Sequence, residues 1–339
     1  MRNIFVTGGL GYIGSHTCVV LIEAGFKVFI IDNLSNSHIT VLDRIERVTG
    51  VRPQFYEGDI RDMSLLAKIF SKHKFNAVIH FAGLKSVGES VGEPIDYYDC
   101  NVGGTVILLA AMQRAKLRKF VFSSSATVYG DPHTVPIKED FPLSATNPYG
   151  RSKLIIENIL ADLSVAEPEW SIARLRYFNP VGAHRSGLLG EDPMGVPNNL
   201  MPYIGQVAVG RKKLLQVFGD DYSTPDGTGV RDYIHVMDLA EGHISALRYC
   251  KNNSGLLTVN LGTGQGYSVI EVVEAYQRAS GRRVPIEITG RRPGDIAQCW
   301  ADPSLAKKVL GWSTRSSLDD MCIDAWRWQN MNPAGYGES

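Results

Sequence analysis

The sequence has few cysteines and no arrangement of them that indicates a disulfide framework or a metal site. Its 339 residues contain five cysteines, an odd number, and they are widely spaced without a Cys-x-x-Cys pair. The eight histidines do not accompany them at metal-ligand spacing. These absences favour a reduced, cytoplasmic protein without structural zinc or another bound metal.

Long apolar runs and an excess of charge of one sign are also missing. No stretch approaches the ~20 apolar residues of a membrane span, and the short apolar run after Met1 predicts no signal peptide. Lys and Arg together number 35, as do Asp and Glu. With no net charge and no basic clusters interleaved with aromatics, we expect neither nucleic-acid nor membrane partners.

The first 180 residues alternate short apolar runs with helical patterns. Strands are predicted at 3–7, 27–31, 53–56, 77–82, 120–123 and 171–177, and helices at 16–24, 63–71, 102–115 and 152–163. Apolar strands separated by helices indicate a parallel sheet covered on both faces. The fold class is therefore α/β, with a doubly wound Rossmann sheet over residues 1–180.

Glycine- and proline-rich stretches follow residue 180 and predict a smaller, mixed α/β substrate domain with long loops over 181–339. Residues 238–248 are expected to form a helix and 257–261 a strand. That strand is expected to return to the first sheet, so the segment near 235–265 belongs to the first domain. The tail at 332–339 is expected to be frayed.

A glycine-rich segment follows the first predicted strand and opens the first helix. Thr7-Gly8-Gly9-Leu10-Gly11-Tyr12-Ile13-Gly14 satisfies both G-x-G-x-x-G and G-x-x-G-x-x-G. Such glycines permit a tight turn and a close backbone approach to a pyrophosphate at the helix N-terminus. Asp32 ends the second strand, where a carboxylate accepts hydrogen bonds from the adenosine ribose and repels a 2′-phosphate. Because no arginine stands beside Asp32, the pattern predicts NAD rather than NADP.

A serine cluster and a Tyr-x-x-x-Lys pair supply candidate catalytic groups. Ser123, Ser124 and Ser125 end the fifth strand, at the sheet edge where ligands bind in such folds. Tyr149 and Lys153 share one face of a predicted helix. A lysine ammonium near the phenol favours the phenolate, so Tyr149 becomes a general base near neutral pH. A serine hydroxyl then relays the proton or holds the substrate oxygen.

These motifs resemble the extended short-chain dehydrogenase/reductase superfamily, and longer stretches resemble its UDP-glucose 4-epimerase (UDP-galactose 4-epimerase) family. The matching segments extend over nearly the whole chain, at 11–17, 80–85, 122–130, 177–184 and 229–236. The resemblance implies an isomerase that reversibly epimerises C4 of UDP-glucose and UDP-galactose through a 4-keto intermediate, with tightly bound NAD taking and returning the hydride. It also implies a homodimer packed through helices of the first domain, as is common in the family.

The resemblance assigns roles to residues. Tyr149 would remove the proton from the sugar 4-hydroxyl, Lys153 would pair with the nicotinamide ribose, and Ser125, with Ser124 nearby, would hydrogen-bond the 4-oxygen. The other NAD contacts would be Gly8, Gly11, Tyr12, Ile13, Gly14, Asp32, Asn33, Leu34, Ser35, Asn36, Ser37, Asp59, Ile60, Phe81, Ala82, Gly83, Leu84, Lys85, Cys100 and Phe178. Cys100 departs from the family, which often has an asparagine there, and so lacks an amide that could bond the cofactor.

Contacts to the nucleotide sugar would come mainly from the second half of the chain. Arg231 and Arg292 would hold the diphosphate, because two planar guanidinium groups suit it. The remaining substrate residues, besides Ser125 and Tyr149, would be Asn179, Asn199, Leu200, Gln216, Val217, Phe218, Asp295 and Cys299. In the family, a bulky tyrosine at the position of Cys299 restricts the pocket to glucose and galactose. Cys299 therefore predicts UDP-GlcNAc and UDP-GalNAc as further substrates, unless neighbouring side chains fill the space.

Two other functions stay open. A nucleotide-sugar dehydratase, or another NAD-dependent nucleotide-sugar enzyme, shares the glycine loop and the Tyr/Lys pair. In the dehydratases Asp-Glu follows the catalytic hydroxyl residue, whereas Ala126-Thr127 stands here and cannot transfer protons in that role, which disfavours dehydration. A non-catalytic NAD sensor would keep the fold without the chemistry, and the presence of all three catalytic residue types argues against it.

Overall fold

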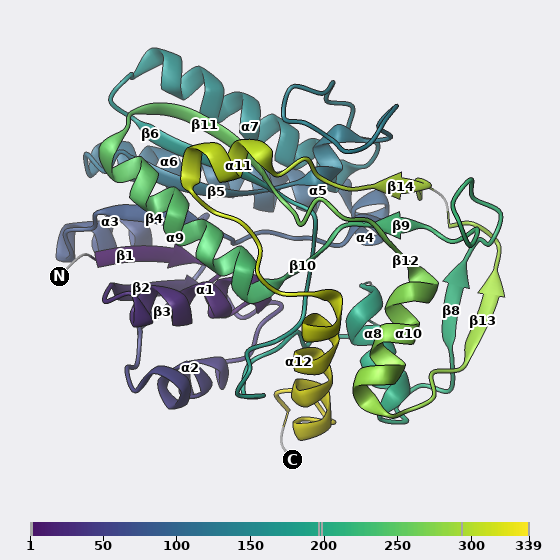
Figure 1. Ribbon diagram of the computed structural model, residues 1–339. Helices are drawn as coiled ribbons and strands as arrows, with labels where there is room; N and C mark the ends of the chain where they lie inside the picture. The colour runs from purple at the N-terminus through teal and green to yellow at the C-terminus, as the bar shows by residue number, and fades with distance from the viewer. Residues whose placement is uncertain (1–2, 196, 198, 293, 338–339) are drawn as a thin grey trace.

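A parallel sheet of seven strands forms the centre of the computed structural model, which describes residues 3–195, 197, 199–292 and 294–337 (Figure 1). The strand order is β11-β6-β5-β4-β1-β2-β3, and each neighbouring pair is parallel. The strands are β1 (Asn3–Thr7), β2 (Lys27–Asp32), β3 (Gln54–Glu57), β4 (Ala77–His80), β5 (Lys119–Ser125), β6 (Ser171–Tyr177) and β11 (Gly255–Leu261). The predicted Rossmann sheet is confirmed.

Helices cover both faces of this sheet, because alternate strand residues point to opposite sides. In β1, Ile4 and Val6 pack into one apolar cluster with side chains of α1, α2, α9 and α11, and Phe5 packs into a second cluster with side chains of α3, α6 and α7. The helices are α1 (Tyr12–Glu23), α2 (Val41–Thr49), α3 (Met63–Lys72), α6 (Gly104–Arg114), α7 (Pro148–Ala166), α9 (Val236–Asn252) and α11 (Ser304–Leu310). Burial on both faces explains why the strands are apolar throughout.

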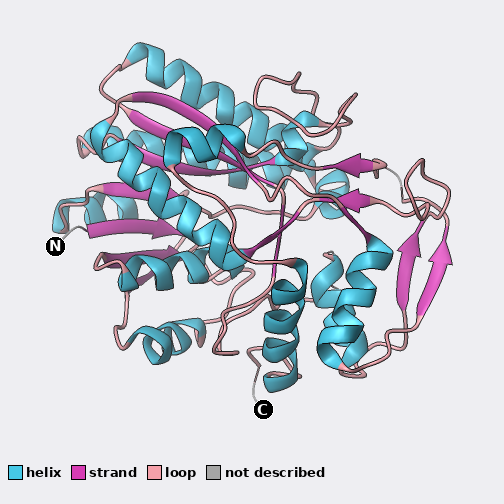
Figure 2. Cartoon of the chain, viewed as in Figure 1, coloured by secondary structure: helices cyan, strands magenta, loops and turns pink. Residues whose placement is uncertain are grey.

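Beside the carboxyl ends of the strands, the later segments build a smaller α/β part (Figure 2). In the described residues β10 pairs with β7, β13 with β8, and β9 with both β12 and β14. Three helices enclose a third apolar cluster. The elements are β7 (Asn179–Val181), β8 (Leu215–Phe218), β9 (Val230–Arg231), β10 (Tyr233–His235), β12 (Tyr267–Ser268), β13 (Ile286–Thr289), β14 (Gln298–Cys299), α8 (Leu200–Ala208), α10 (Val269–Ser280) and α12 (Leu318–Met331). A domain boundary at residue 180 stays a prediction.

Two connections refine the sequence expectations. The helix predicted at 102–115 is preceded by short α4 (Val87–Gly92) and α5 (Pro94–Tyr97) and begins as a π-helix, η1 (Tyr98–Gly103), that continues into α6. A 3₁₀ turn, η2 (Ala126–Tyr129), follows β5. The predicted return strand is confirmed, because β11 pairs with β6 along its whole length. The π-helix is of interest because such turns occur frequently at functional sites.

The expectation of a frayed tail at 332–339 is wrong for the residues described, which end at 337; residues 338–339 lie outside them. Tyr336 is only 8% exposed, and its ring centroid lies 4.6 Å from that of Trp328. Its hydroxyl also donates a hydrogen bond of 3.1 Å to the carbonyl oxygen of Gly190. The contact with Gly190 joins residues 146 positions apart in the sequence, so no local pattern reveals it.

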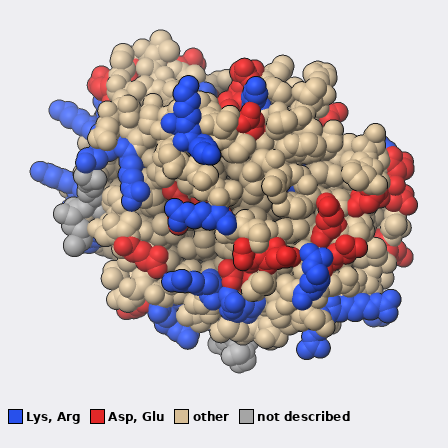
Figure 3. Space-filling view, in the orientation of Figure 1, with Lys and Arg blue, Asp and Glu red and all other residues tan. Residues whose placement is uncertain are grey.

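The surface carries charge of both signs. On the face drawn in Figure 3, basic and acidic side chains are interspersed among other residues, in keeping with their equal numbers in the sequence. Among the described residues, no helix is long and apolar enough to cross a membrane. The same part of the chain holds no group of three or more His, Cys, Asp or Glu side chains arranged to bind a metal ion.

Candidate active site

The residues predicted to hold the cofactor gather at the carboxyl edge of the central sheet. They lie in the segments that follow β1, β2, β3, β4 and β6, in η1, and in the first turns of α7. The parallel sheet brings these segments together, because the carboxyl ends of its strands meet at one edge. The predicted substrate residues lie at the end of β5, at the start of α7 and in the smaller part, from β7 to β14.

The glycine loop leaves no room for a side chain at Gly8 or Gly14. A Cβ atom on Gly14 would lie 2.2 Å from the carbonyl oxygen of Gly8, and one on Gly8 would lie 2.6 Å from the amide nitrogen of Ala82. Gly8 also has a φ of +66°, a conformation that favours glycine. Helix α1 has Gly11 as its N-cap, without a side-chain hydrogen bond to the first turn. The helix N-terminus can therefore offer its amides to a pyrophosphate, so the residues fit a dinucleotide.

Asp32 connects the glycine loop to the segment after β2. One of its carboxylate oxygens accepts a hydrogen bond from the Leu10 amide at 3.0 Å. The other accepts from the Leu34 amide at 3.0 Å and the Ser37 hydroxyl at 2.8 Å. These donors fix the carboxylate where the sequence placed the ribose contact, and its position fits NAD.

The segment after β3 is hydrogen-bonded to the segment after β2. The Asn33 side-chain amide donates to Asp59 at 3.0 Å, and Arg61 forms an ion pair of 2.8 Å with the same carboxylate. Hydrogen bonds from Arg61 lower the pKa of Asp59 to about 2. Asp59 is therefore an anion at neutral pH whose position is set by its neighbours.

Asn101 is a site residue that the sequence reasoning missed. Its side chain accepts from the Leu84 amide at 2.8 Å and donates to the Leu84 carbonyl at 3.1 Å and to the Ser152 hydroxyl at 3.0 Å. Ser152 in turn donates to the Tyr149 carbonyl at 2.7 Å. Asn101 therefore links the loop after β4 to the start of α7, while its half-buried neighbour Cys100 was the residue that the family comparison singled out. Asn101 stands beside Cys100 in the same motif, which is the signal that was available.

Ser125, Tyr149 and Lys153 meet at the end of β5. Ser125 lies close enough to Tyr149 for its side chain to lower the pKa of the Tyr149 hydroxyl by hydrogen bonding, which favours the phenolate. Lys153 is buried, and its ammonium donates a hydrogen bond of 2.8 Å to the carbonyl oxygen of Ser123 and lies 5.9 Å from the centroid of the Tyr149 ring. The structure therefore assembles the three candidate groups from β5 and α7.

The pKa of Tyr149 differs from the value that the sequence predicts. Burial raises the pKa of Tyr149, and the Ser125 hydrogen bond only partly opposes that rise. Burial also lowers the pKa of Lys153 to about 8. The expected lowering of the Tyr149 pKa is therefore not found, because desolvation penalises the charged forms of both groups.

Ser124 points to the other side of β5, because strand side chains alternate. Its hydroxyl donates a hydrogen bond of 2.5 Å to Glu157, which is fully buried. Glu157 also forms an ion pair of 2.6 Å with Arg176. The two serines thus have different surroundings: Ser125 faces Tyr149, and Ser124 belongs to a buried polar network.

The predicted sugar-site residues come together around β9 and β14. Cys299 is the register partner of Arg231 across these two parallel strands. The Cys299 side chain belongs to an apolar cluster that includes Phe178, and it is 8% exposed. Asn179 follows Phe178 directly and begins β7. The structure therefore places Cys299 beside both a predicted cofactor residue and a predicted diphosphate residue.

The predicted nucleotide contacts lie on β8 and the segment before β14. The guanidinium of Arg292 lies 5.4 Å from the Phe218 ring centroid and forms an ion pair of 3.1 Å with Asp295. Gln216 is exposed, whereas the Val217 side chain is 1% exposed within the third apolar cluster. Only the backbone of Val217 is therefore available to a ligand. Asn199 and Leu200 lie at the start of α8, where Asn199 is the N-cap.

This constellation joins a dinucleotide loop to a Ser–Tyr–Lys site and defines a Rossmann-fold enzyme of the short-chain dehydrogenase/reductase class. A protein-family model described as GDP-mannose 4,6 dehydratase matches residues 5–325. A Bacillus subtilis UDP-glucose 4-epimerase is 58% identical over 333 residues, which are 98% of each chain. Within that class, the chain belongs to the UDP-glucose 4-epimerase family.

Solved structures agree with this assignment. The crystal structure of UDP-glucose 4-epimerase from Bifidobacterium longum in complex with NAD+ and UDP is 53% identical, with a TM-score of 0.96, over 98% of this chain and all of that one. That of UDP-glucose-4-epimerase from Stenotrophomonas maltophila, with bound NAD and formylated UDP-arabinopyranose, is 53% identical, with a TM-score of 0.97, over 99% and 100%. The likeness therefore covers the central sheet and the smaller part together.

Proposed function

We propose that the chain reversibly interconverts UDP-glucose and UDP-galactose by epimerisation at C4, with NAD held throughout. The observation that carries this proposal is that Ser125, Tyr149 and the buried Lys153 meet at the carboxyl edge of the sheet, with the Lys153 ammonium 5.9 Å from the centroid of the Tyr149 ring. Family membership supports it independently. NAD, when bound, accepts the C4 hydrogen as hydride and returns it.

The residues of the chain perform the proton chemistry. Tyr149 takes the proton of the sugar 4-hydroxyl and Ser125 holds the 4-oxygen, so the sugar becomes a 4-keto intermediate as its C4 hydrogen leaves. The keto sugar then presents its opposite face, and Tyr149 returns the proton to the 4-oxygen. The net redox change is zero, so the cofactor does not need to leave. Lys153 orients the cofactor ribose and, as an ammonium, stabilises the Tyr149 phenolate.

The remaining ligand contacts follow the family assignment. Asp32, Asn33, Asp59 and the glycine loop hold the cofactor. Arg231 and Arg292 hold the diphosphate, and Phe218 offers a ring face to the base. Dehydration is the weaker candidate even though the matching family model is described as a dehydratase, because Ala126 and Thr127 supply no acid/base pair after Ser125.

The small side chain of Cys299 also favours UDP-GlcNAc and UDP-GalNAc as substrates. A cysteine leaves the volume of an aromatic ring free compared with tyrosine, and Cys299 lies beside Phe178 and Arg231 in the predicted sugar site. We expect an N-acetyl group to occupy that volume.

We further propose a cytoplasmic homodimer, packed through α6 and α7. Val106 on α6 and Ile155 on α7 are 45% and 38% exposed, which gives both helices apolar side chains on the outer surface. A second copy would cover these side chains.

The test is to offer the purified protein UDP-galactose and UDP-GalNAc separately, without added NAD, and to separate the epimers by chromatography. Conversion of both is expected. Conversion of UDP-galactose alone would keep the epimerase and refute the wider sugar specificity. Conversion of neither, even after NAD is added, would refute the epimerase and favour an NAD sensor.

A further inference from the structure

A buried carboxylate, Glu191, lies between the predicted cofactor and substrate residues. One of its oxygens accepts hydrogen bonds from the Lys85 ammonium at 3.1 Å and from the Asn199 side-chain amide at 2.8 Å. The Glu191 side chain is 7% exposed, whereas that of Lys85 is 46% exposed. Lys85 lies near the end of the loop between β4 and α4, and Asn199 is the N-cap of α8. A single oxygen thus joins the two parts of the molecule.

The C-terminal tail holds Glu191 in this position. The Trp328 indole of α12 donates to the Glu191 carbonyl oxygen at 3.3 Å. The Tyr336 hydroxyl accepts from the Gly190 amide at 3.0 Å, and the Tyr336 amide donates to Asp192 at 2.7 Å. A Cβ atom on Gly190 would lie 2.2 Å from the Trp328 ring, so the loop packs closely against α12. Residues on both sides of Glu191 are therefore fixed.

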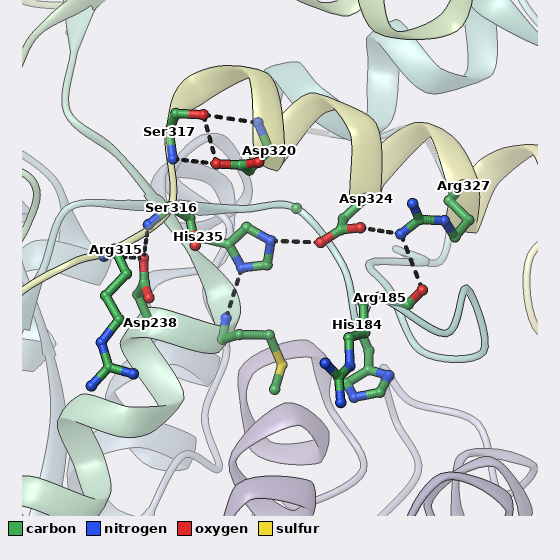
Figure 4. Close-up of polar contacts among 12 residues, drawn as sticks. His184, Arg185, His235, Asp238, Arg315, Ser316, Ser317, Asp320, Asp324 and Arg327 are labelled. Atoms are coloured by element: carbon green, nitrogen blue, oxygen red, sulfur yellow. Dashed lines mark hydrogen bonds and ion pairs between the residues drawn. The ribbon is translucent and has the colours of Figure 1, made fainter.

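Helix α12 is itself anchored to the rest of the fold (Figure 4). The His235 ring bonds to Asp324 at 3.2 Å, and Asp324 also pairs with Arg327. Arg327 donates to the carbonyl oxygen of Arg185 at 3.0 Å, in the loop that leads to Glu191. These contacts connect α12 to the start of α9 and to that loop.

Residues near Glu191 also contact two other segments that lie at the predicted cofactor site. Asp192 lies 3.6 Å from His38, just after the segment that follows β2. The Tyr12 hydroxyl, from the first turn of α1, donates to the Gly182 carbonyl at 2.7 Å. Burial, with the nearby charges of Glu191 and Tyr336, raises the pKa of Tyr12. The loop that carries Glu191 therefore touches the surroundings of the cofactor from several sides.

We propose that Glu191 is a positioning residue shared by the two ligand sites, which sets the place of the Lys85 ammonium for the cofactor and of the Asn199 amide for the nucleotide sugar. The inference rests on the proposed function, because that function assigns ligands to Lys85 and Asn199. Its physical basis is that a charged acceptor with little solvent holds its donors more firmly than a neutral one does. A carboxylate bonded to both donors also limits how far either can move without the other.

The test combines Glu191→Gln with Lys85→Met and Asn199→Ala, singly and in pairs. Two binding readouts are used: the NAD that the holoenzyme releases on dialysis, and the Kd for UDP by calorimetry. Glu191→Gln keeps the shape but removes the charge, so we expect NAD release and the Kd for UDP to rise, each about three- to tenfold. Glu167→Gln is the matched control, because Glu167 also forms an ion pair, 3.1 Å from Arg118, and plays no part in the site.

Non-additivity separates positioning from a general structural role. Adding Glu191→Gln to Lys85→Met should release no further NAD, and adding it to Asn199→Ala should not weaken UDP binding further. Full additivity, or unchanged binding in Glu191→Gln, overturns the inference. If Glu191→Gln does not fold, Tyr336→Phe is the second variant. It retains the Glu191 carboxylate but removes the hydroxyl that bonds Gly190, so the loop that positions Glu191 is held less firmly. NAD release and the Kd for UDP should then both rise, and no rise in either would overturn the inference. Wild-type turnover of UDP-galactose, measured beside these assays, separates failure of the inference from failure of the proposed function.

Discussion

Replacing Ser124 and Ser125 separately by alanine should produce opposite results, although the two residues are adjacent. Ser124 donates to the fully buried Glu157 at 2.5 Å, whereas the Ser125 side chain lies beside Tyr149 and lowers its pKa. Ser124→Ala removes one donor from a buried carboxylate and should lower the free energy of unfolding by about 1–3 kcal/mol. Glu157 keeps its 2.6 Å ion pair with Arg176, so the loss should not approach that of an unpaired buried charge.

The same substitution should leave turnover almost unchanged, because the Ser124 hydroxyl faces away from Tyr149. Ser125→Ala should keep the stability within about 0.5 kcal/mol and lower kcat by roughly 100-fold, as expected for a group that holds the reacting oxygen. Urea unfolding and UDP-galactose turnover measure the two effects. A large loss of kcat in Ser124→Ala, with Ser125→Ala nearly as active as the wild type, would refute this assignment.

Three further predictions follow from the structure. Gly14→Ala places a Cβ atom against the Gly8 carbonyl oxygen, so the protein should purify without NAD; a normal NAD content by absorbance would contradict this. Cys299→Tyr should reduce turnover of UDP-GalNAc at least about tenfold and spare UDP-galactose; equal losses would refute the pocket argument. Three buried histidines stay neutral in the folded protein, with pKa values lowered by burial to about 3, 4 and 3 for His16, His243 and His80. The unfolded chain takes up these protons as the pH falls through about 6.5, so the free energy of unfolding should fall with decreasing pH, with a slope that approaches about 4 kcal/mol per pH unit near pH 5; urea unfolding without such a slope would contradict it.

Local spacing was enough to predict the central features of the site. The glycine loop occupies one strand–helix junction, Asp32 ends the next strand, and Tyr149 and Lys153 lie four residues apart at the start of one helix; the structure places each at the carboxyl edge of the sheet. The parallel sheet itself followed from apolar runs, because its strands are buried on both faces.

The two serines show where a small boundary error mattered. The fifth strand was predicted at 120–123, with the serine cluster taken as its end, whereas the extended backbone of β5 includes all three serines, from Lys119 to Ser125. With the full strand, alternation alone would have placed Ser124 on the opposite face from Ser125. The resemblance instead grouped both residues as catalytic.

Contacts between distant segments escaped the sequence reasoning. Glu191 lies in a glycine-rich stretch without periodicity, and Tyr336 lies in a tail expected to be frayed. Both are buried because α12 presents Trp328 to them, which no pattern near either residue indicates. The pKa of Tyr149 was missed for a related reason, since desolvation depends on the whole fold around the ring.

The central claim is that Tyr149 transfers the proton in an otherwise redox-neutral epimerisation. The most direct measurement compares kcat for UDP-galactose in wild type and Tyr149→Phe, with the bound NAD of each protein quantified after denaturation. Tyr149→Phe keeps the ring, so we expect it to fold and to hold NAD while kcat falls by about 100- to 10,000-fold. A variant that holds NAD and turns over within tenfold of wild type would contradict the account.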